Sequence, residues 1–197
     1  MKHLISFFAV LALSLAAAMA QQDTGKPQVT IRTNHGEIRL ELYPEESPVT
    51  VANFLQYAND GFYDGTVFHR VISHFMIQGG GMSLVEGENG MNMVPKPTRD
   101  PIVNEANNGL KNERGTIAMA RTNNVNSATS QFFINVELNG SLDFTSDLNP
   151  EDSRAWGYTV FGRVIDGMDV VDDIRFVETG PQDVPTEPVI IESVEVN

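Results

Sequence analysis

The chain has 197 residues, of which 41% are hydrophobic, and it carries a formal net charge of −13. A chain of this length and composition can bury one sizeable core, so we expect a single globular domain. The excess of acidic side chains argues against nucleic acid and anionic membranes as partners, because both attract basic surfaces. Since the chain has no cysteine, disulfides and thiol catalysis are excluded.

Residues 1–20 differ in character from the rest of the chain. Lys2 provides a positive start, residues 5–18 are apolar, and Ala18-Met19-Ala20 has the small-x-small form of a cleavage site. This pattern is typical of a secretory signal peptide, and its apolar run is too short to favour a permanent transmembrane helix. The mature chain is expected to begin near Gln21.

These features predict three segments: a signal peptide over 1–20, a flexible polar tether over 21–27 and one domain over 28–197. We expect an exported protein that resides in the periplasm, or is secreted if the cell has no outer membrane. After cleavage we expect a monomer with no membrane contact.

The domain opens with two alternating stretches, 29–33 and 37–43, on either side of Asn34-His35-Gly36. This arrangement predicts a β-hairpin. Ser47 then offers a helix N-cap and Pro48 a first helical position, so we expect a helix over 48–59. Its single apolar stripe is expected to cover the core.

The densest chemistry lies in residues 66–81, where 66–72 and 75–78 predict two short strands ended by glycines. A period of two puts Phe68 and Arg70 on one face and His69 on the other. An arginine beside apolar neighbours either pairs with a carboxylate as a structural residue or lies in a cleft where it meets a ligand. The spacing alone leaves both interpretations open.

About 35 residues after Gly81 show little periodicity, which indicates either a functional excursion or a wrong assignment. Further on, the pattern predicts strands and a helix. Since strands outnumber helices and no βαβ alternation occurs, a barrel with two helices is indicated. The expected elements are strands over 116–120, 130–136, 158–164 and 189–196, with a helix from a cap at Asp166 through Ile174.

Five sequence blocks follow one another in a particular order: Phe68-His69-Arg70-Val71-Ile72, Phe75-Met76-Ile77-Gln78-Gly79-Gly80, Gly115-Thr116-Ile117-Ala118-Met119-Ala120, Ser130-Gln131-Phe132-Phe133-Ile134-Asn135 and Tyr158-Thr159-Val160-Phe161-Gly162-Arg163-Val164. Together they resemble the cyclophilin family of peptidyl-prolyl cis-trans isomerases, over roughly 28–196. Residues 104–122 resemble its short bacterial exported branch in particular. The resemblance implies a mainly β fold: a closed, mostly antiparallel eight-stranded barrel capped by two α-helices, with a long loop after Gly81 beside the binding groove.

The resemblance also implies an enzyme that accelerates rotation about X-Pro bonds in unfolded or extended segments of exported proteins. The barrier to this rotation is about 20 kcal/mol, because the prolyl nitrogen shares its lone pair with the carbonyl group. An apolar pocket for the proline ring, a donor aimed at the prolyl nitrogen and polar contacts to the peptide are sufficient to lower it. No nucleophile, metal or cofactor is required.

By resemblance, Arg70 is the catalytic arginine, and Gln78 and Gln131 hold the peptide backbone and orient Arg70. The backbone of Ala120 and Arg121 pairs with an extended substrate. Phe132 should face the core instead, because it points opposite to its neighbours. The residues expected to line the proline pocket are Phe75, Met76, Phe133, Leu142 and Tyr158.

Two positions depart from the pattern of many eukaryotic members. Ser141 stands where they have a tryptophan, and Tyr158 stands where they have a histidine. The tyrosine keeps an apolar body with a polar tip. The serine removes an indole donor, which puts sensitivity to cyclosporin in doubt.

The alternative to the enzyme is a non-catalytic module, a chaperone or scaffold that binds proline-containing segments without accelerating their rotation. A mere binder could dispense with Arg70, so its presence favours the enzyme. The histidines have no carboxylate at ligand spacing, which speaks against a metal site. The glycines at 79–81 do not precede a Gly-Lys-Ser/Thr sequence, which speaks against a phosphate loop.

Overall fold

The computed structural model describes residues 25–87, 90–146 and 153–197. The predicted signal peptide and most of the predicted tether lie outside this part of the chain. Of the tether, Lys26 lies 4.4 Å above the ring of Tyr43, and the carbonyl of Pro27 accepts a hydrogen bond from the Leu42 amide. The packed domain therefore includes residues 26 and 27.

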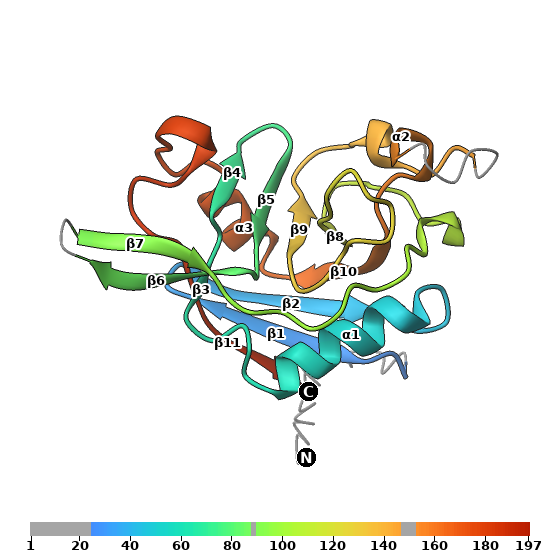
Figure 1. The fold of residues 1–197 in the computed structure, drawn as a ribbon, viewed down its shortest axis with the longest axis horizontal. Helices are drawn as coiled ribbons and strands as arrows, with labels where there is room; N and C mark the ends of the chain where they lie inside the picture. The colour runs from blue at the N-terminus through green and yellow to red at the C-terminus, as the bar shows by residue number, and fades with distance from the viewer. Residues whose placement is uncertain (1–24, 88–89, 147–152) are drawn as a thin grey trace, which may run out of the picture.

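The structure is mainly β (Figure 1). Helix α1 crosses the side formed by β1, β2 and β11. The other side is formed by β4, β5, β8 and β9. Helix α3 packs against β4 and β5. The strands are β1 Gln28–Thr33, β2 Gly36–Leu42, β3 Thr66–Val67, β4 Arg70–Ile72, β5 Met76–Gly79, β6 Met82–Gly87, β7 Gly90–Pro95, β8 Thr116–Met119, β9 Phe132–Asn135, β10 Val160–Asp166 and β11 Ile190–Val196. The helices are α1 Pro48–Asn59, α2 Ser153–Trp156 and α3 Met168–Arg175, with 3-10 turns η1 Ala106–Asn108, η2 Gly140–Leu142 and η3 Pro181–Asp183.

The N-terminal hairpin and α1 confirm the predictions. Strands β1 and β2 pair in register around the expected turn, and their alternate residues enter the core. Helix α1 has the predicted bounds, but its cap differs. The Ser47 hydroxyl donates to the carbonyl of Val160, and the Glu105 carboxylate instead accepts from the amides of Val49 and Thr50 at 3.1 and 2.8 Å.

The prediction of a closed eight-stranded barrel is wrong in its number of strands. Backbone pairing among the described residues gives an open sheet rather than a closed barrel. Pairing joins eleven strands, all antiparallel to their neighbours, in the open order β4-β5-β9-β8-β10-β2-β1-β11-β3-β6-β7. The count rises because the expected strand over 66–72 is interrupted at Phe68-His69, and because the stretch after Gly81, for which no strand was expected, forms β6 and β7. Gly80 has φ +80°, and a Cβ there would lie 2.6 Å from the Phe132 ring, so the chain turns where only glycine fits.

The weak periodicity after Gly81 suggested a stretch without regular structure, but this stretch contains strands. Its first half is a hairpin of β6 and β7 that projects from the body of the domain (Figure 1). Most of its side chains are partly or fully exposed, and Met91 is 58% exposed. With both faces near solvent, the strands show no apolar and polar alternation, which explains why the sequence did not reveal them.

Two details differ near the C-terminus. The N-cap of α3 is Gly167, with φ +85°, rather than Asp166. A third helix, the single turn α2, adds to the two that were expected.

The main core is rich in packed aromatic rings. Phe132 meets Phe54, Tyr63 and Phe68 at centroid distances of 5.7, 5.6 and 6.0 Å, each edge to face. Phe132 is fully buried, which confirms the prediction made from alternation. Burying one such side chain typically contributes about 1.5–3 kcal/mol, so this cluster fixes the strands on which the site is built.

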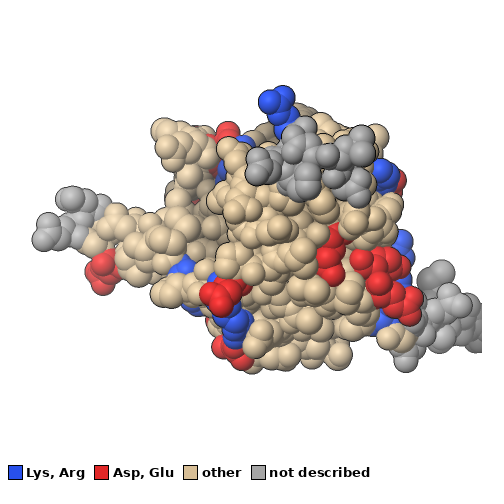
Figure 2. Space-filling view, turned by 45° about the vertical axis from the view of Figure 1, so that its right-hand side comes forward, with Lys and Arg blue, Asp and Glu red and all other residues tan. Residues whose placement is uncertain are grey.

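The surface in Figure 2 carries its charged side chains in small separate groups, with uncharged residues over most of the visible area. Within the described residues, no helix is long and apolar enough to cross a membrane.

Candidate active site

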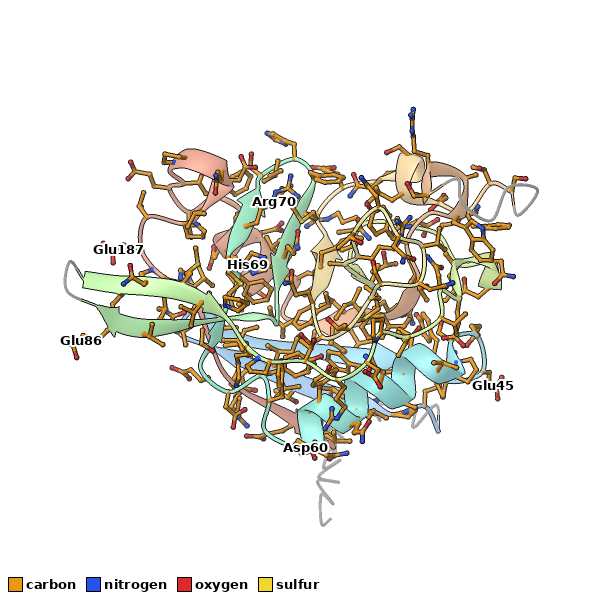
Figure 3. The ribbon with its side chains drawn as sticks, viewed as in Figure 1. Glu45, Asp60, His69, Arg70, Glu86 and Glu187 are labelled. Atoms are coloured by element: carbon orange, nitrogen blue, oxygen red, sulfur yellow. The ribbon has the colours of Figure 1, made fainter. Side chains whose placement is uncertain are left out.

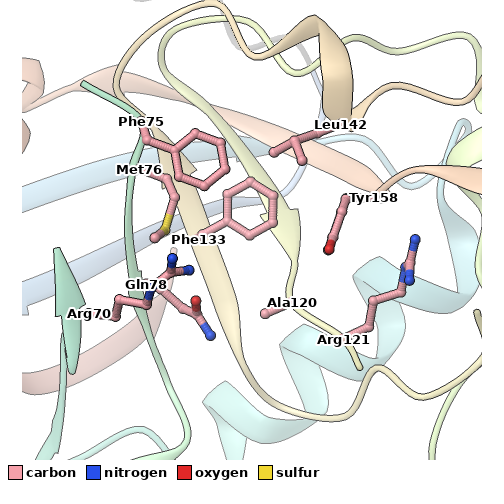
Figure 4. A pocket seen from close by; sticks show the side chains of 9 residues that line it. All are labelled: Arg70, Phe75, Met76, Gln78, Ala120, Arg121, Phe133, Leu142 and Tyr158. Carbon is pink, nitrogen blue, oxygen red and sulfur yellow. The ribbon is translucent and has the colours of Figure 1, made fainter. Parts of the chain in front are cut away.

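A cavity of about 130 Å³ opens on the sheet face opposite the main core (Figure 4). A cavity of this size suits a small ring rather than a large ligand. Of the ten predicted site residues only Gln131 is absent from the lining. The lining residues are Arg70, Phe75, Met76, Gln78, Ala120, Arg121, Phe133, Leu142 and Tyr158.

Strand register explains why these residues converge. Arg70 pairs with Gln78, and Gln78 pairs with Phe133 on the next strand. Directly opposed residues of neighbouring strands share a face, so the cation, the amide and the ring form one row. Their strand neighbours point into the core instead, as the burial of Val71 and Ile77 shows.

The prediction that Phe68 and Arg70 share a face is wrong. Phe68 is 1% exposed and packs against Phe132 in the main core, while Arg70 lines the cavity. The chain leaves the sheet between β3 and β4, at Phe68-His69, so the period of two does not continue across the break. Figure 3 shows His69 and Arg70 at different levels of the fold.

The apolar wall of the cavity is a second, smaller hydrophobic cluster. Met76 and Phe133 are almost fully buried in it, and Leu142 and Tyr158 pack against it. The rings of Phe133 and Tyr158 meet edge to face, with centroids 5.7 Å apart. Because this cluster is separate from the main core, its surface can accept an apolar group without disturbing the fold.

A close approach of two loops places Leu142 and Tyr158. Gly157 has φ +63°, and a Cβ there would lie 2.5 Å from the carbonyl oxygen of Leu142. That same oxygen accepts a 2.8 Å hydrogen bond from the Tyr158 amide. A side chain at 157 would therefore push Tyr158 away from the cavity.

Three asparagines behind the wall hold its backbone, and sequence reasoning did not find them. Asn139 donates to the carbonyl of Phe75 at 2.8 Å, and Asn112 donates to the carbonyl of Leu142 at 3.0 Å. Asn135 links the two, donating to Asn112 and accepting from Asn139. The only signal in the sequence is the polar Asn135 at the end of an otherwise apolar strand.

Arg121 forms the far side of the cavity with its side chain. Its guanidinium donates to the carbonyls of Gly157 and Ser153 and lies 4.4 Å from the centre of the Tyr158 ring. Burial lowers the pKa of Arg121, but an arginine stays charged under ordinary conditions. The resemblance implied a main-chain contact at this residue and gave the side chain no role.

The amide of Ala120 is already engaged, because it donates to the carbonyl of Gln131 at 2.9 Å. Gln78 in turn donates to the side-chain oxygen of Gln131 at 3.0 Å. Gln131 packs against Gly81, where a Cβ would lie 2.3 Å from its Cγ. Gln131 therefore supports Gln78 from beside the cavity rather than lining it.

Within the described residues, neither glutamine accepts a hydrogen bond from Arg70, so the expectation that they orient Arg70 is not met. The ion-pair partner of Arg70 is Asp183 in η3, with 3.5 Å between Nε and Oδ2. Arg70 thus pairs with a carboxylate, as the structural interpretation expects, and also lines a cleft, as the ligand-binding interpretation requires. Nothing in the sequence pointed to Asp183, which lies in a distant loop.

A larger cavity of about 420 Å³ lies between the β6–β7 hairpin and residues 184–188. No charged side chain lines it. The smaller cavity combines an apolar wall with convergent polar groups, which is the usual constitution of a binding site, and it is therefore the candidate active site.

Residues 28–196 match the family model described as "Cyclophilin type peptidyl-prolyl cis-trans isomerase/CLD". The chain belongs to the cyclophilin family of peptidyl-prolyl cis-trans isomerases. It is 56% identical over 173 residues to peptidyl-prolyl cis-trans isomerase B of Escherichia coli, covering 86% of this chain and 99% of that one. It is also 47% identical over 192 residues to peptidyl-prolyl cis-trans isomerase A of Dickeya dadantii, covering 95% and 94% of the two chains.

A solved cyclophilin-type isomerase from Cryptosporidium parvum, crystallised in the presence of the dipeptide Ala-Pro, superposes with a TM-score of 0.68. It is 27% identical and covers 86% of this chain and 98% of its own. The resemblance inferred from the five blocks is confirmed, and the chain is a peptidyl-prolyl cis-trans isomerase. Family membership thereby favours the enzyme over the non-catalytic module.

Proposed function

We propose that this cyclophilin turns X-Pro bonds by holding the proline ring in the 130 Å³ cavity while Arg70 stabilises the twisted amide. The observation that carries the proposal is the row formed by Arg70, Gln78 and Phe133, which places a permanent cation beside an apolar wall. As the bond twists, the prolyl nitrogen regains its lone pair and can accept a hydrogen bond. A donor at the cavity edge stabilises this state more than the planar ground state.

Arg70 suits electrostatic stabilisation rather than acid-base work. A guanidinium is charged at all physiological pH values and offers five donors but no acceptor. The mechanism therefore needs no proton transfer and no covalent intermediate. It requires only that the donors of Arg70 are placed before the bond begins to rotate.

The peptide on either side of the proline would be held by polar groups at the rim. Gln78, fixed by Gln131, offers an amide to the substrate backbone. Because the Ala120 amide is engaged, the Ala120 carbonyl is the group that would pair with an extended chain. These contacts favour extended or unfolded proline-containing segments as substrates, and the Ala-Pro dipeptide named with the Cryptosporidium relative supports this class.

The physiological substrates would be unfolded exported proteins, and the enzyme would act on them as a monomer in the periplasm. The support is the pattern of residues 1–20, with its charged start, short apolar run and small-x-small site. N-terminal sequencing of exported protein should begin at or near Gln21. An intact Met1 on exported material would contradict the export proposal without affecting the mechanism.

A protease-coupled assay with a proline-containing peptide tests the role of Arg70. We expect Arg70→Ala to lower kcat/KM roughly a hundredfold, because loss of a preorganised donor typically costs about 3 kcal/mol. Arg70→Lys should keep only part of the parent kcat/KM, since a point charge does not reproduce the planar fork of the guanidinium. Arg163→Ala, which removes a charge from β10 outside the cavity, is the matched control and should keep the parent activity. Parent activity in Arg70→Ala would make Arg70 a structural residue.

A further inference from the structure

Asp183 is the only carboxylate of the described residues within ion-pairing distance of Arg70. Its Oδ2 lies 3.5 Å from Arg70 Nε, and the two side chains are 46% and 41% exposed. In the described part of the chain, no other side chain accepts a hydrogen bond from Arg70. Whatever fixes the direction of this guanidinium in the free enzyme must therefore include Asp183.

The contact engages one particular edge of the guanidinium. Arg70 carries its donors in a rigid planar fork, with Nε on the stem side and two terminal nitrogens beyond it. The closest approach of Asp183 is to Nε, which leaves the terminal donors free to serve the cavity. In Figure 4 the guanidinium lies beside Gln78, at the rim of the apolar wall.

The backbone that carries Asp183 is held in an unusual conformation. Gln182 and Asp183 have φ values of +63° and +61°, in the left-handed region that residues other than glycine seldom occupy. The loop is closed beneath them by a 2.8 Å hydrogen bond from the Gly180 amide to the Val184 carbonyl. Two consecutive residues in this region need a surrounding structure that enforces them, and such strain gathers at functional sites.

We infer that Asp183 is a positioning residue for Arg70: its carboxylate holds the Nε edge so that the terminal donors point into the cavity before substrate binds. The inference rests on the role proposed above for Arg70. Asp183 itself lines no part of the cavity, so it does not act on the substrate directly.

Replacing Asp183 by asparagine removes the negative charge of the side chain and changes little else. Asparagine has nearly the same shape and tolerates the left-handed region, so Asp183→Asn should keep the loop and lose the ion pair. Exposed ion pairs are weak, so we expect kcat to fall by about two- to fivefold, with KM nearly unchanged. Asp183→Gly suits the same backbone, removes the carboxylate entirely and should show the same loss.

Glu195→Gln provides the matched control. Glu195 pairs with Arg32 through a contact of 3.0 Å, and the two side chains are exposed to a similar degree as those of the Arg70 pair. The variant removes the same charge outside the cavity, so its kcat should equal that of the parent. Equal losses in Glu195→Gln and Asp183→Asn would show a general effect of net charge and overturn the inference.

A double-mutant cycle separates this inference from the function on which it rests. In an Arg70→Ala background, Asp183→Asn should cause no further loss, because the group that it positions is gone. If Arg70→Ala alone keeps the parent kcat, the proposed function of Arg70 fails. If Arg70→Ala is slow but Asp183→Asn matches or exceeds the parent, only the positioning role fails. If Asp183→Asn still lowers kcat in the Arg70→Ala background, the positioning role fails as well.

Discussion

The guanidinium of Arg121 lies 4.4 Å from the centre of the Tyr158 ring. It also donates a hydrogen bond to the carbonyl of Gly157, the residue before Tyr158. This stacking joins two loops into one wall of the candidate active site. A cation over an aromatic face is worth about 0.5–2 kcal/mol, depending on how far it is desolvated. Arg121 therefore stabilises the shape of the cavity and lies at the side opposite the proposed catalytic cation (Figure 4).

Arg121→Ala should weaken substrate binding more than it slows turnover. Without the guanidinium, Tyr158 loses its support and the wall relaxes, while Arg70 keeps its place. We expect KM to rise several-fold with kcat within about twofold of the parent, corresponding to loss of binding common to ground and transition states. Steady-state kinetics on a proline peptide would measure both. A large fall in kcat at unchanged KM would mean that Arg121 acts on the twisted bond itself.

Glu105→Gln should lower the free energy of unfolding by about 1–2 kcal/mol, since its carboxylate satisfies two amides at the start of α1. Denaturant unfolding followed by circular dichroism would measure the change. Glu45 is exposed just before the same helix (Figure 3), and Glu45→Gln is expected to leave stability unchanged. Equal stability of the parent and Glu105→Gln would show that the start of α1 does not need the Glu105 carboxylate.

His69 should make the domain less stable in mild acid. Burial lowers the pKa of His69 and the charge of Arg70 lowers it further, although a hydrogen bond with the Val67 backbone opposes this. Below about pH 6.5 the unfolded chain takes up a proton that the folded protein resists, so the stability present above that pH is lost as the pH falls. His69→Gln should flatten the pH dependence of unfolding between about pH 5 and 7. His35→Gln, the same substitution at an exposed turn, is the control variant. A parent-like slope in His69→Gln would locate the effect elsewhere.

Cyclosporin should bind this enzyme weakly, because exposed Ser141 stands in η2 beside Leu142 where many eukaryotic cyclophilins have an indole donor. Ser141→Trp should tighten binding in a titration. Tight binding to the parent would show that the donor at this position is dispensable.

The sequence predicted the fold best where local patterns and burial agree. The β1–β2 hairpin follows from clean alternation, and α1 follows from Pro48 at a position that suits the start of a helix. It failed at Phe68-His69, where the direction of the chain depends on pairing with distant strands. The β6–β7 hairpin was missed because neither of its faces is consistently buried.

For the active site, residue patterns alone left Arg70 between a structural and a functional role. The resemblance favours the functional role and supplied most of the lining residues. It did not supply Asp183, Asn139 or Glu105, because each acts through a contact between segments that lie far apart in the chain. Such contacts are set by tertiary packing, and no local periodicity records them.

The proposed mechanism requires that Arg70 stabilises the twisted bond rather than the bound peptide. Exchange spectroscopy by NMR on a saturated complex with a proline peptide measures the rate of cis-trans interconversion on the enzyme, separately from affinity. For Arg70→Ala we predict that this rate falls roughly a hundredfold, from the loss of about 3 kcal/mol of transition-state stabilisation, while the dissociation constant changes little. Interconversion at the parent rate in the bound state, whether or not affinity falls, would contradict this role of Arg70.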